Sequence, residues 1–312
     1  MDITHHGDSF LIMQVADAHL DFLNDGPPEE HTLKLISDAI DTQKPDLVIS
    51  TGDLLSSQVS EHTLRGFCEF MAEKKQRWAF VFGNHDAEYG APAPMLEQIL
   101  LNDPWCIYEH GDPSIKGYGN YVINIWDKND MVKWTLYMMD SGAGNKTRNI
   151  GGWDYMDHTQ VYWYAKTRDT INARYGPHSS LFFFHIPLPE YHEVWNTKTC
   201  LGSKNESICA PKINSGLFTA MLEDGGAKGV FVGHDHTNDF VGELYGVRLC
   251  YGRGTGFRHN GRGGYGKEGF LHGVRMIKLG MGPEKRNDFT TYLYLEDGTV
   301  ETEPVVHEPE QA

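Results

Sequence analysis

Residues 229–240 read GVFVGHDHTNDF, an apolar run that ends in several polar and ionisable side chains. The apolar run VFV predicts a buried strand, and the glycine after it marks the end of that strand. Two imidazoles then stand at alternate positions, because His234 and His236 flank Asp235. If the chain leaves the strand in an extended conformation, both histidines aim at one centre and Asp235 points away. Asp17 and His19, which follow another apolar run at the same spacing, are expected to converge in the same way. Exposed turns often carry polar residues, so the motif gains meaning only from companions elsewhere in the chain.

Four other apolar runs end in polar residues of the same kinds. They read QVADAH, VISTGD, FVFGNHD and FFFHIP, and they are continuous rather than alternating, as in strands that are covered on both faces. The polar residues that close these runs are Asp17, His19, Asp53, Asn84, His85, Asp86 and His185. Open α/β sheets gather their ligand sites at the carboxyl ends of strands, so we expect these side chains to meet there. A glycine before Asp53, Asn84 and His234 permits a sharp turn close to an ion.

Helical patterns separate the early strands. Apolar residues recur at helical spacing from Leu33 to Ile40, which predicts β-α-β units. Further helices are predicted over residues 157–175 and 215–222. No internal repeat divides the chain, so we expect a single domain over residues 1–302 and an acidic tail over residues 303–312.

The composition is typical of a soluble globular protein. Hydrophobic residues make up 40% of the chain and charged residues 22%. The sequence has no stretch approaching the roughly 18 consecutive apolar residues of a membrane span, so no membrane association is expected. Acidic residues outnumber basic ones by 43 to 27, and a net charge of −16 argues against nucleic acid as a partner.

The first residues and the cysteines bear on the cellular compartment. The start, MDITHHGDSF, lacks the pattern of a signal peptide, which favours a cytoplasmic protein; secretion is the alternative if a signal peptide was trimmed from it. The five cysteines form no CxxC pair, so a thiolate zinc site is not expected. Cys200 and Cys209 flank the polar loop LGSKNESI and would form a local disulfide in an exported protein.

The polar residues at the strand ends predict a metal centre. Three carboxylate or amide oxygens and four imidazoles suit Mn, Fe or Zn better than calcium. Seven donors are too many for one tetrahedral ion. They suffice for two divalent ions if one carboxylate bridges, and two metals about 3.5–4 Å apart serve in-line phosphoryl displacement. The seven donors are Asp17, His19, Asp53, Asn84, His185, His234 and His236.

The ordered motifs D-x-H, G-D, G-N-H-D, a later lone histidine and G-H-x-H resemble those of the calcineurin-like metallophosphoesterases. The stretches FHIPLPEY, NSGLF and GHDHTNDF are similar to the purple-acid-phosphatase-like branch of that family. The resemblance runs from about Phe10 to Leu279. It implies an α/β fold, a four-layer αββα sandwich of two mixed β-sheets flanked by helices.

The resemblance also implies roles for the matching positions. The first metal would be held by Asp17, His19 and His236, the second by Asn84, His185 and His234, and Asp53 would bridge them. A metal-bound hydroxide would attack phosphorus. Of the catalytic candidates, His85 would protonate the departing oxygen or stabilise the transition state, and Asp86 would orient a histidine.

One position departs from the purple acid phosphatases, which carry a tyrosine three residues after the bridging aspartate. Here Asp53 is followed by Leu54, Leu55 and Ser56. The purple chromophore is therefore not expected. A pair of divalent ions is favoured over a site with a permanent ferric ion.

The predicted function is hydrolysis of phosphate monoesters, with a small phosphorylated molecule or a phosphoprotein as substrate. A phosphodiesterase is the alternative, since the same metals cleave both kinds of ester. A non-catalytic metal-binding scaffold is the second alternative. It would have lost a ligand or the acid histidine, and the sequence keeps both.

Substrate contacts are expected from Asn84, His85, Arg258 and His192. Arg258 lies in the glycine-rich segment 251–269, whose charged residues either contact a phosphate or form a solvated rim. The other such residues are Arg253, His259 and Arg262. His192 and the adjacent Tyr191 and Trp195 either line a leaving-group pocket or take part in packing.

Overall fold

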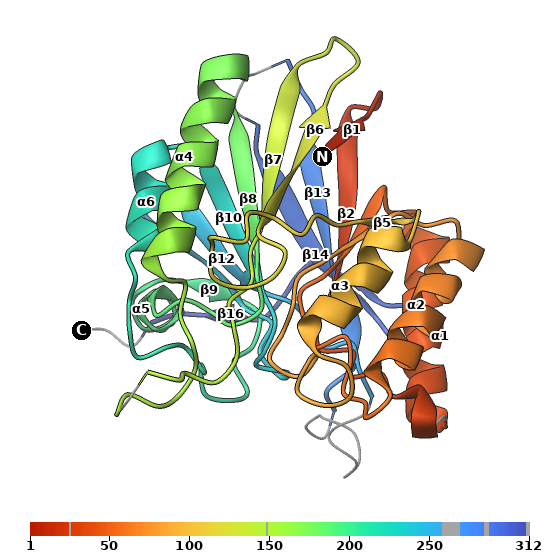
Figure 1. The fold of residues 1–312 in the computed structure, drawn as a ribbon. Coiled ribbons are helices and arrows are strands. Elements are labelled where there is room, and N and C mark those ends of the chain that lie inside the picture. The colour runs from red at the N-terminus through yellow and green to blue at the C-terminus, as the bar shows by residue number, and fades with distance from the viewer. Residues whose placement is uncertain (25, 148, 258–268, 284–286, 310–312) are drawn as a thin grey trace.

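The computed structural model describes residues 1–24, 26–147, 149–257, 269–283 and 287–309. Two β-sheets pack against each other and helices cover their outer faces, which gives four layers (Figure 1). Each sheet contains both parallel and antiparallel pairs. The expected αββα sandwich of two mixed sheets is therefore confirmed.

One sheet has seven strands and contains the first long apolar run. Its strands are β2 (Ser9–Val15), β3 (Leu47–Ser50), β4 (Trp78–Phe80), β5 (Cys106–Ile107), β13 (Gly273–Gly280), β14 (Phe289–Leu295) and β15 (Val300–Glu301). Their order is β15-β14-β13-β2-β3-β4-β5, and β2 to β5 run parallel. The helices between the parallel strands are α1 (Pro27–Gln43), α2 (Ser60–Glu73) and α3 (Ala93–Asn102), and the 3-10 turn η1 (Phe22–Asn24) precedes α1.

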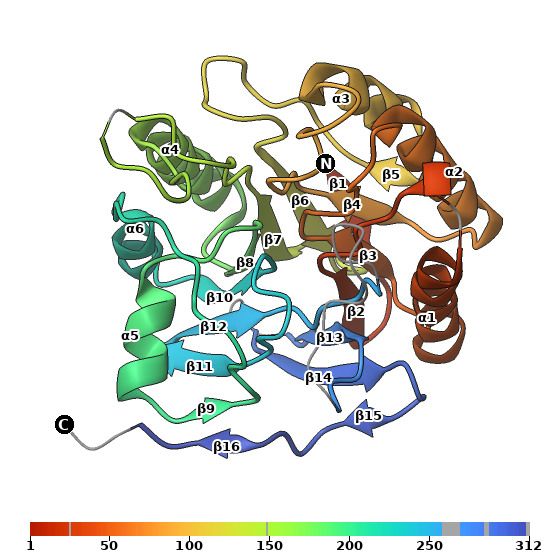
Figure 2. The ribbon, with the colours of Figure 1, turned by 90° about the horizontal axis from the view of Figure 1, so that it is seen from below.

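The other sheet has nine strands. They are β1 (Asp2–Thr4), β6 (Tyr121–Trp126), β7 (Val132–Met138), β8 (Ser179–Phe183), β9 (Cys200–Leu201), β10 (Ala227–Val232), β11 (Val241–Leu244), β12 (Val247–Tyr251) and β16 (Val306–His307). Their order is β1-β6-β7-β8-β10-β12-β11-β9-β16. Three helices cover this sheet: α4 (His158–Tyr175), α5 (Glu190–Thr197) and α6 (Leu217–Asp224) (Figure 2).

Strand β8 shows why the apolar runs are continuous. Every residue of β8 is buried, and successive side chains point to opposite faces of the sheet. Leu181 and Phe183 join the cluster between the two sheets, where Phe231 of β10 contacts Phe289 of β14. Phe182 points the other way and packs edge-on against Tyr164 of α4, with ring centroids 5.0 Å apart. Because both faces of β8 are buried, polar residues do not alternate with apolar ones along the strand.

The helix predicted over residues 157–175 is confirmed, and its start has a clear cause. The side chain of Asp157 accepts hydrogen bonds from the backbone N–H groups of Thr159 and Gln160, and the Gln160 Oε1 accepts one from the backbone N–H of Asp157. The helix predicted from residue 215 begins two residues later, at Leu217. Gly216 adopts a left-handed φ of 81°, which a helix cannot include.

Two other expectations are changed by the structure. The Cys200–Cys209 disulfide, considered only for an exported protein, is not formed in this structure, where both thiols are free. Cys200 lies buried in β9 and its Sγ faces the Val194 carbonyl, whereas the Sγ of Cys209 faces the Ser207 carbonyl. Within the expected tail, Val306 and His307 form β16 and pair with β9.

None of the helices in the described ranges is sufficiently long and apolar to cross a lipid bilayer.

Candidate metal centre

The donor residues predicted from the sequence lie in loops that follow five strands from both sheets. Asp17 and His19 follow β2, Asp53 follows β3, and Asn84 follows β4. His185 follows β8, and the GHDH turn follows β10. Strands β2, β3 and β4 belong to one sheet and β8 and β10 to the other. The candidate centre is therefore built where the strand ends of the two sheets meet.

The backbone of these loops is coiled rather than extended. Asp17, His19, Asp53 and His234 all have positive φ angles, at 55°, 47°, 49° and 77°. The expectation that Asp17 and His19 converge through an extended strand end is therefore wrong, and so is the same expectation for His234 and His236. A residue other than glycine is strained at a positive φ angle, and hydrogen bonds between the loops maintain this conformation here. The His19 N–H donates to the Asp53 carbonyl at 2.9 Å, and the His234 N–H donates to both Asp17 oxygens at 3.1 and 3.0 Å.

The three glycines before donor residues allow very close packing of the loops. A Cβ on Gly83 would lie 2.3 Å from the backbone nitrogen and the Oδ1 of Asp53. A Cβ on Gly233 would lie 2.7 Å from the Oδ2 of Asp17. Gly52 combines a φ of +87° with a Cβ position 2.7 Å from Gly83 and from the Nδ1 of His185. Only glycine fits these positions without moving a donor.

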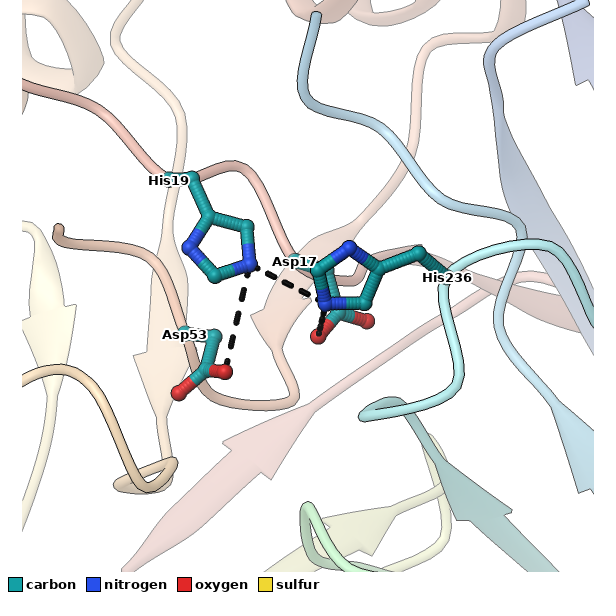
Figure 3. A group of neighbouring side chains, drawn as sticks. All are labelled: Asp17, His19, Asp53 and His236. Carbon is teal, nitrogen blue, oxygen red and sulfur yellow. Dashed lines mark hydrogen bonds and ion pairs between the residues drawn. The ribbon is translucent and has the colours of Figure 1, made fainter. Parts of the chain in front are cut away.

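The first donor group comprises Asp17, His19, Asp53 and His236, whose ligand atoms lie within 4.8 Å of one another (Figure 3). The Nε2 atoms of His19 and His236 are 3.2 Å apart. The Nε2 of His236 lies 3.5 Å from the Oδ1 of Asp17, and the Nε2 of His19 lies 3.9 Å from the Oδ2 of Asp53. All four side chains are buried.

The second donor group comprises Asp53, His185 and His234, and Asn84 joins it. The Nε2 of His185 lies 3.2 Å from the Oδ2 of Asp53, 3.0 Å from the Oδ1 of Asn84 and 3.2 Å from the Nδ1 of His234. Asp53 belongs to both groups. The seven predicted donors are thus brought together around one shared carboxylate.

The hydrogen bonding of His185 fits a cation site. Its Nδ1 lies 2.9 Å from the Thr51 carbonyl, which can only accept, so Nδ1 carries a proton. In the neutral ring the Nε2 lone pair then faces the oxygens of Asp53 and Asn84, a repulsion that a proton on Nε2 or a cation between the atoms removes. Accordingly, although burial lowers the pKa of His185, the carboxylate of Asp53 outweighs it and raises that pKa to about 10.

The neighbouring groups respond to burial and to the same charges. Burial raises the pKa of Asp17 well above its ordinary value. For Asp53, burial also acts to raise the pKa, but the charges of His185 and His19 hold it below its usual range. Burial, together with the charge of His185, lowers the pKa of His234 to about 3, so this imidazole is neutral and able to act as a ligand. Within the described part of the chain, its Nε2 has no hydrogen-bond partner. The donor set therefore fits a borderline divalent metal.

Asp86 supports the site in a different way from the one predicted. Its carboxylate accepts hydrogen bonds from the backbone N–H groups of Asp53, Leu55 and Gly83, at 2.9, 2.9 and 2.7 Å. It is fully buried. These three hydrogen bonds tie the β3 loop to the β4 loop. They do not orient a histidine, which was the role expected for Asp86.

His85 stands at the border between the donor groups and a cavity. Its backbone N–H donates to the Oδ1 of Asp53 at 2.7 Å, and its ring lies 5.4 Å from that of His19. The Nδ1 of His85 is ion-paired with Glu88. Glu88 was not among the predicted site residues, although it follows His85 at a spacing of three residues in the GNHDAE turn.

The cavity beside His85 has a volume of about 970 Å³. Its lining includes Asn84, His85 and Glu88 from the β4 loop and Lys116, Tyr118 and Trp153 from loops beyond β5 and β7. Trp153 also packs edge-on against His234, with ring centroids 4.2 Å apart. These loop residues were missed because they carry no motif and reach the site only through the tertiary fold.

The other expected substrate contacts lie elsewhere or outside the described residues. Arg258, with His259 and Arg262, falls outside the described ranges. Arg253 is ion-paired with Asp239 and donates to the Leu271 carbonyl, so it is committed to the fold.

The residues after FHIPLPE lie on α5. His192 is exposed and is not among the described residues that line the cavity. Tyr191 is fully buried against Tyr251, and Trp195 stacks on His307 with centroids 3.7 Å apart. For Tyr191 and Trp195 the packing alternative therefore holds.

Known proteins with similar sequences belong to a family of phosphoesterases. The model of the calcineurin-like phosphoesterase family matches residues 10–238. The chain belongs to this family. It is 30% identical over 305 residues to "Probable inactive purple acid phosphatase 14" of Arabidopsis thaliana, a match that covers 86% of this chain and 75% of the relative. This relative supports the purple-acid-phosphatase-like branch indicated by the motifs.

Other relatives and solved structures extend the comparison. The chain is 32% identical over 281 residues to Phosphatase DCR2 of Saccharomyces cerevisiae, covering 78% of this chain and 48% of the relative. A dimetal phosphatase from Danio rerio shares the fold with a TM-score of 0.58 and 14% identity, covering 90% of this chain and 98% of the other. GAP50, the anchor in the inner membrane complex of Plasmodium, has a TM-score of 0.59 and 11% identity, covering 97% and 91%.

Proposed function

We propose that this protein hydrolyses phosphate monoesters with the help of two divalent cations drawn from Mn, Fe and Zn. The observation that carries the proposal is the pair of donor groups that share Asp53 beside the cavity at His85. Seven donors exceed the needs of one tetrahedral ion, and a shared carboxylate is the natural bridge between two.

The predicted donors and His85 have separate roles in the proposed reaction. Asp17, His19 and His236 would hold one cation, Asn84, His185 and His234 the other, and Asp53 both. Bound divalent cations would supply a water of lowered pKa and neutralise the phosphate oxygens. The attacking water releases a proton to solvent. As its oxygen forms a P–O bond, the P–O bond to the leaving alcohol breaks and that electron pair stays on the departing oxygen. His85 borders the cavity and donates a proton to that oxygen, then regains one from solvent.

The cavity argues for a substrate larger than inorganic phosphate. Its volume of about 970 Å³ and its aromatic lining residues Tyr118 and Trp153 leave room for a sizeable leaving group. A small phosphorylated molecule and a phosphorylated side chain of a protein both satisfy this requirement. The same space would also admit the second ester group of a phosphodiester, which remains the alternative activity.

The scaffold alternative finds no support in the donor set. A metal-binding protein without activity would be expected to lack a ligand or the acid histidine. This chain keeps all seven donors and His85 in one place. The word "inactive" in the name of the Arabidopsis relative applies to that protein.

The test is turnover by protein loaded separately with Mn²⁺, Fe²⁺ or Zn²⁺. We expect hydrolysis of p-nitrophenyl phosphate that exceeds hydrolysis of bis-p-nitrophenyl phosphate, and loss of both after chelation. A preference for the diester would favour the phosphodiesterase. No turnover of either ester with any of the three metals would contradict the proposed function.

A further inference from the structure

The side chain of Glu88 lies where it can control the orientation of the proposed acid, His85. Both residues line the cavity, and the carboxylate of Glu88 is ion-paired with the Nδ1 of His85. The β4 loop brings them together in one turn, in which the Glu88 N–H donates to the His85 carbonyl at 3.1 Å. The pair therefore belongs to the local structure of the GNHDAE turn.

His85 is held at two points that act on different parts of the residue. Its backbone N–H donates to the Oδ1 of Asp53, which places the residue beside the donor groups. Its ring is held by Glu88. Because an ionised carboxylate can only accept hydrogen bonds, the Nδ1 of His85 must carry a proton in this pair. The protonated ring then offers its Nε2–H to the leaving group, and the neutral ring left after the transfer keeps its proton on Nδ1.

We infer that Glu88 is a positioning residue for the phosphomonoesterase reaction, which fixes the ring of His85 so that Nε2 meets the departing oxygen. The inference rests on the proposed function and deepens it. Glu88 would not touch the substrate phosphate or a metal ion. Its contribution would be the geometry and tautomer of the ring.

The exposure of the pair separates this role from a structural one. The side chains of His85 and Glu88 are 23% and 41% exposed. An ion pair this open to solvent adds little to stability. Removing Glu88 should therefore leave the fold and the metal content intact while changing how well the ring is held.

The experiment compares Glu88→Ala and Glu88→Gln with a matched control. Glu61 of α2 is 42% exposed, is ion-paired with Arg65 and lies outside the cavity at His85, so Glu61→Ala removes a similar pair elsewhere. Each protein is tested on p-nitrophenyl phosphate, whose leaving group needs little protonation, and on glycerol 2-phosphate, whose alkoxide needs much.

We expect Glu88→Ala to lower kcat on glycerol 2-phosphate by on the order of 10- to 100-fold and on p-nitrophenyl phosphate by less than about threefold. KM should stay within about twofold, because ground-state binding is unchanged. Glu88→Gln should restore much of kcat on the alkyl ester, since its amide oxygen also accepts from Nδ1. Glu61→Ala should match the wild type on both substrates.

A second readout does not depend on turnover. Nitrogen chemical shifts of the His85 ring, measured in Zn²⁺-loaded protein and assigned by their loss in His85→Gln, report which nitrogen carries the proton. In the neutral form of the ring, which is observed above its pKa, we expect the proton on Nδ1 in the wild type and a mixture of tautomers in Glu88→Ala. An unchanged tautomer, or equal effects of Glu88→Ala and Glu61→Ala on glycerol 2-phosphate, would overturn the inference. Absence of turnover by the wild type would refute the proposed function alone, because the ring measurement still decides the role of Glu88.

Discussion

Asp53 is constrained through both its backbone and its side chain. Its backbone N–H donates to Asp86 at 2.9 Å, and its Oδ1 accepts from the His85 N–H at 2.7 Å. Its Oδ2 faces His185 and His19 from the two donor groups. A φ of 49° makes this conformation costly for an aspartate, so the neighbouring loops must maintain it. Small changes next to Asp53 should therefore disturb metal binding.

Gly83→Ala is expected to reduce metal binding. The added Cβ would stand 2.3 Å from the backbone nitrogen and the Oδ1 of Asp53. Overpacking of this kind costs about 1–3 kcal/mol in the free energy of unfolding, and here it also displaces a donor. Metal content by plasma emission and the midpoint of chemical denaturation should both fall. Gly144→Ala is the control, because its Cβ would meet nothing within 4 Å. Equal metal content in the two variants would contradict the role given to Gly83.

Asp86→Ala is expected to destabilise the whole protein. Three backbone N–H groups, two of them buried, would lose their acceptor, which lowers the free energy of unfolding by on the order of 3 kcal/mol. Urea denaturation measures the loss. Asp297→Ala provides the comparison, since Asp297 also accepts a backbone hydrogen bond, from Thr299, but is exposed. If the two variants lost equal stability, Asp86 would not hold the loops together.

The sequence predicts the donor residues well because each follows an apolar run and carries a ligand side chain. Glu88 and Trp153 were missed for physical reasons. Glu88 reaches His85 through a tight turn in which a carboxylate has no distinctive pattern. Trp153 meets His234 only after the loop beyond β7 folds over the strand ends. Side chains that act by packing or by orienting a neighbour form no recognisable sequence motif, whereas metal ligands do.

At the scale of elements, the strand ends and helix starts depend on single residues. The boundaries of α4 were predictable because Asp157 and Gln160 form a capping box. The start of α6 was not predicted correctly, since Gly216 has a left-handed conformation and the helix begins only after it, at Leu217. The coiling of the loop after β2 was also missed: the D-x-H spacing brings two donors together in an extended strand and in this left-handed turn alike. Spacing fixes which residues meet but not the backbone path.

Asp157→Ala should remove the cap of α4. The variant leaves the backbone N–H groups of Thr159 and Gln160 without their acceptor and should lower the free energy of unfolding by about 1 kcal/mol. Asp157→Asn should stay close to the wild type, because asparagine is also a good N-cap. Thermal unfolding followed by circular dichroism would report both. A variant with alanine as stable as the one with asparagine would show that the cap does not matter.

At the scale of the whole molecule, the sandwich brings strand ends of two sheets to one place. The four-layer fold follows from buried strands and amphipathic helices, together with the family resemblance. The strand order could not be predicted from the sequence, because pairings such as β13 with β2 join residues that are distant in the chain. Long-range pairing of this kind also leaves buried titratable groups at the joins. His272, just before β13, is one of them.

Acid should destabilise the fold partly through His272. Burial lowers its pKa to about 4 in the folded protein, whereas the unfolded chain titrates near 6.5. Between these values the unfolded state binds more protons, so the free energy of unfolding falls as pH falls. The full difference corresponds to on the order of 3 kcal/mol. Urea denaturation at pH 7 and pH 4 should show a shallower pH dependence for His272→Gln than for the wild type. Parallel curves would exclude this contribution.

The most direct test of the account is an anomalous difference map from crystals of the protein grown with Mn²⁺. The account predicts two peaks about 3.5–4 Å apart on either side of the Asp53 carboxylate. One peak should lie among Asp17, His19 and His236, and the other among Asn84, His185 and His234. A single peak, or no peak among these side chains in crystals with ample Mn²⁺, would contradict it.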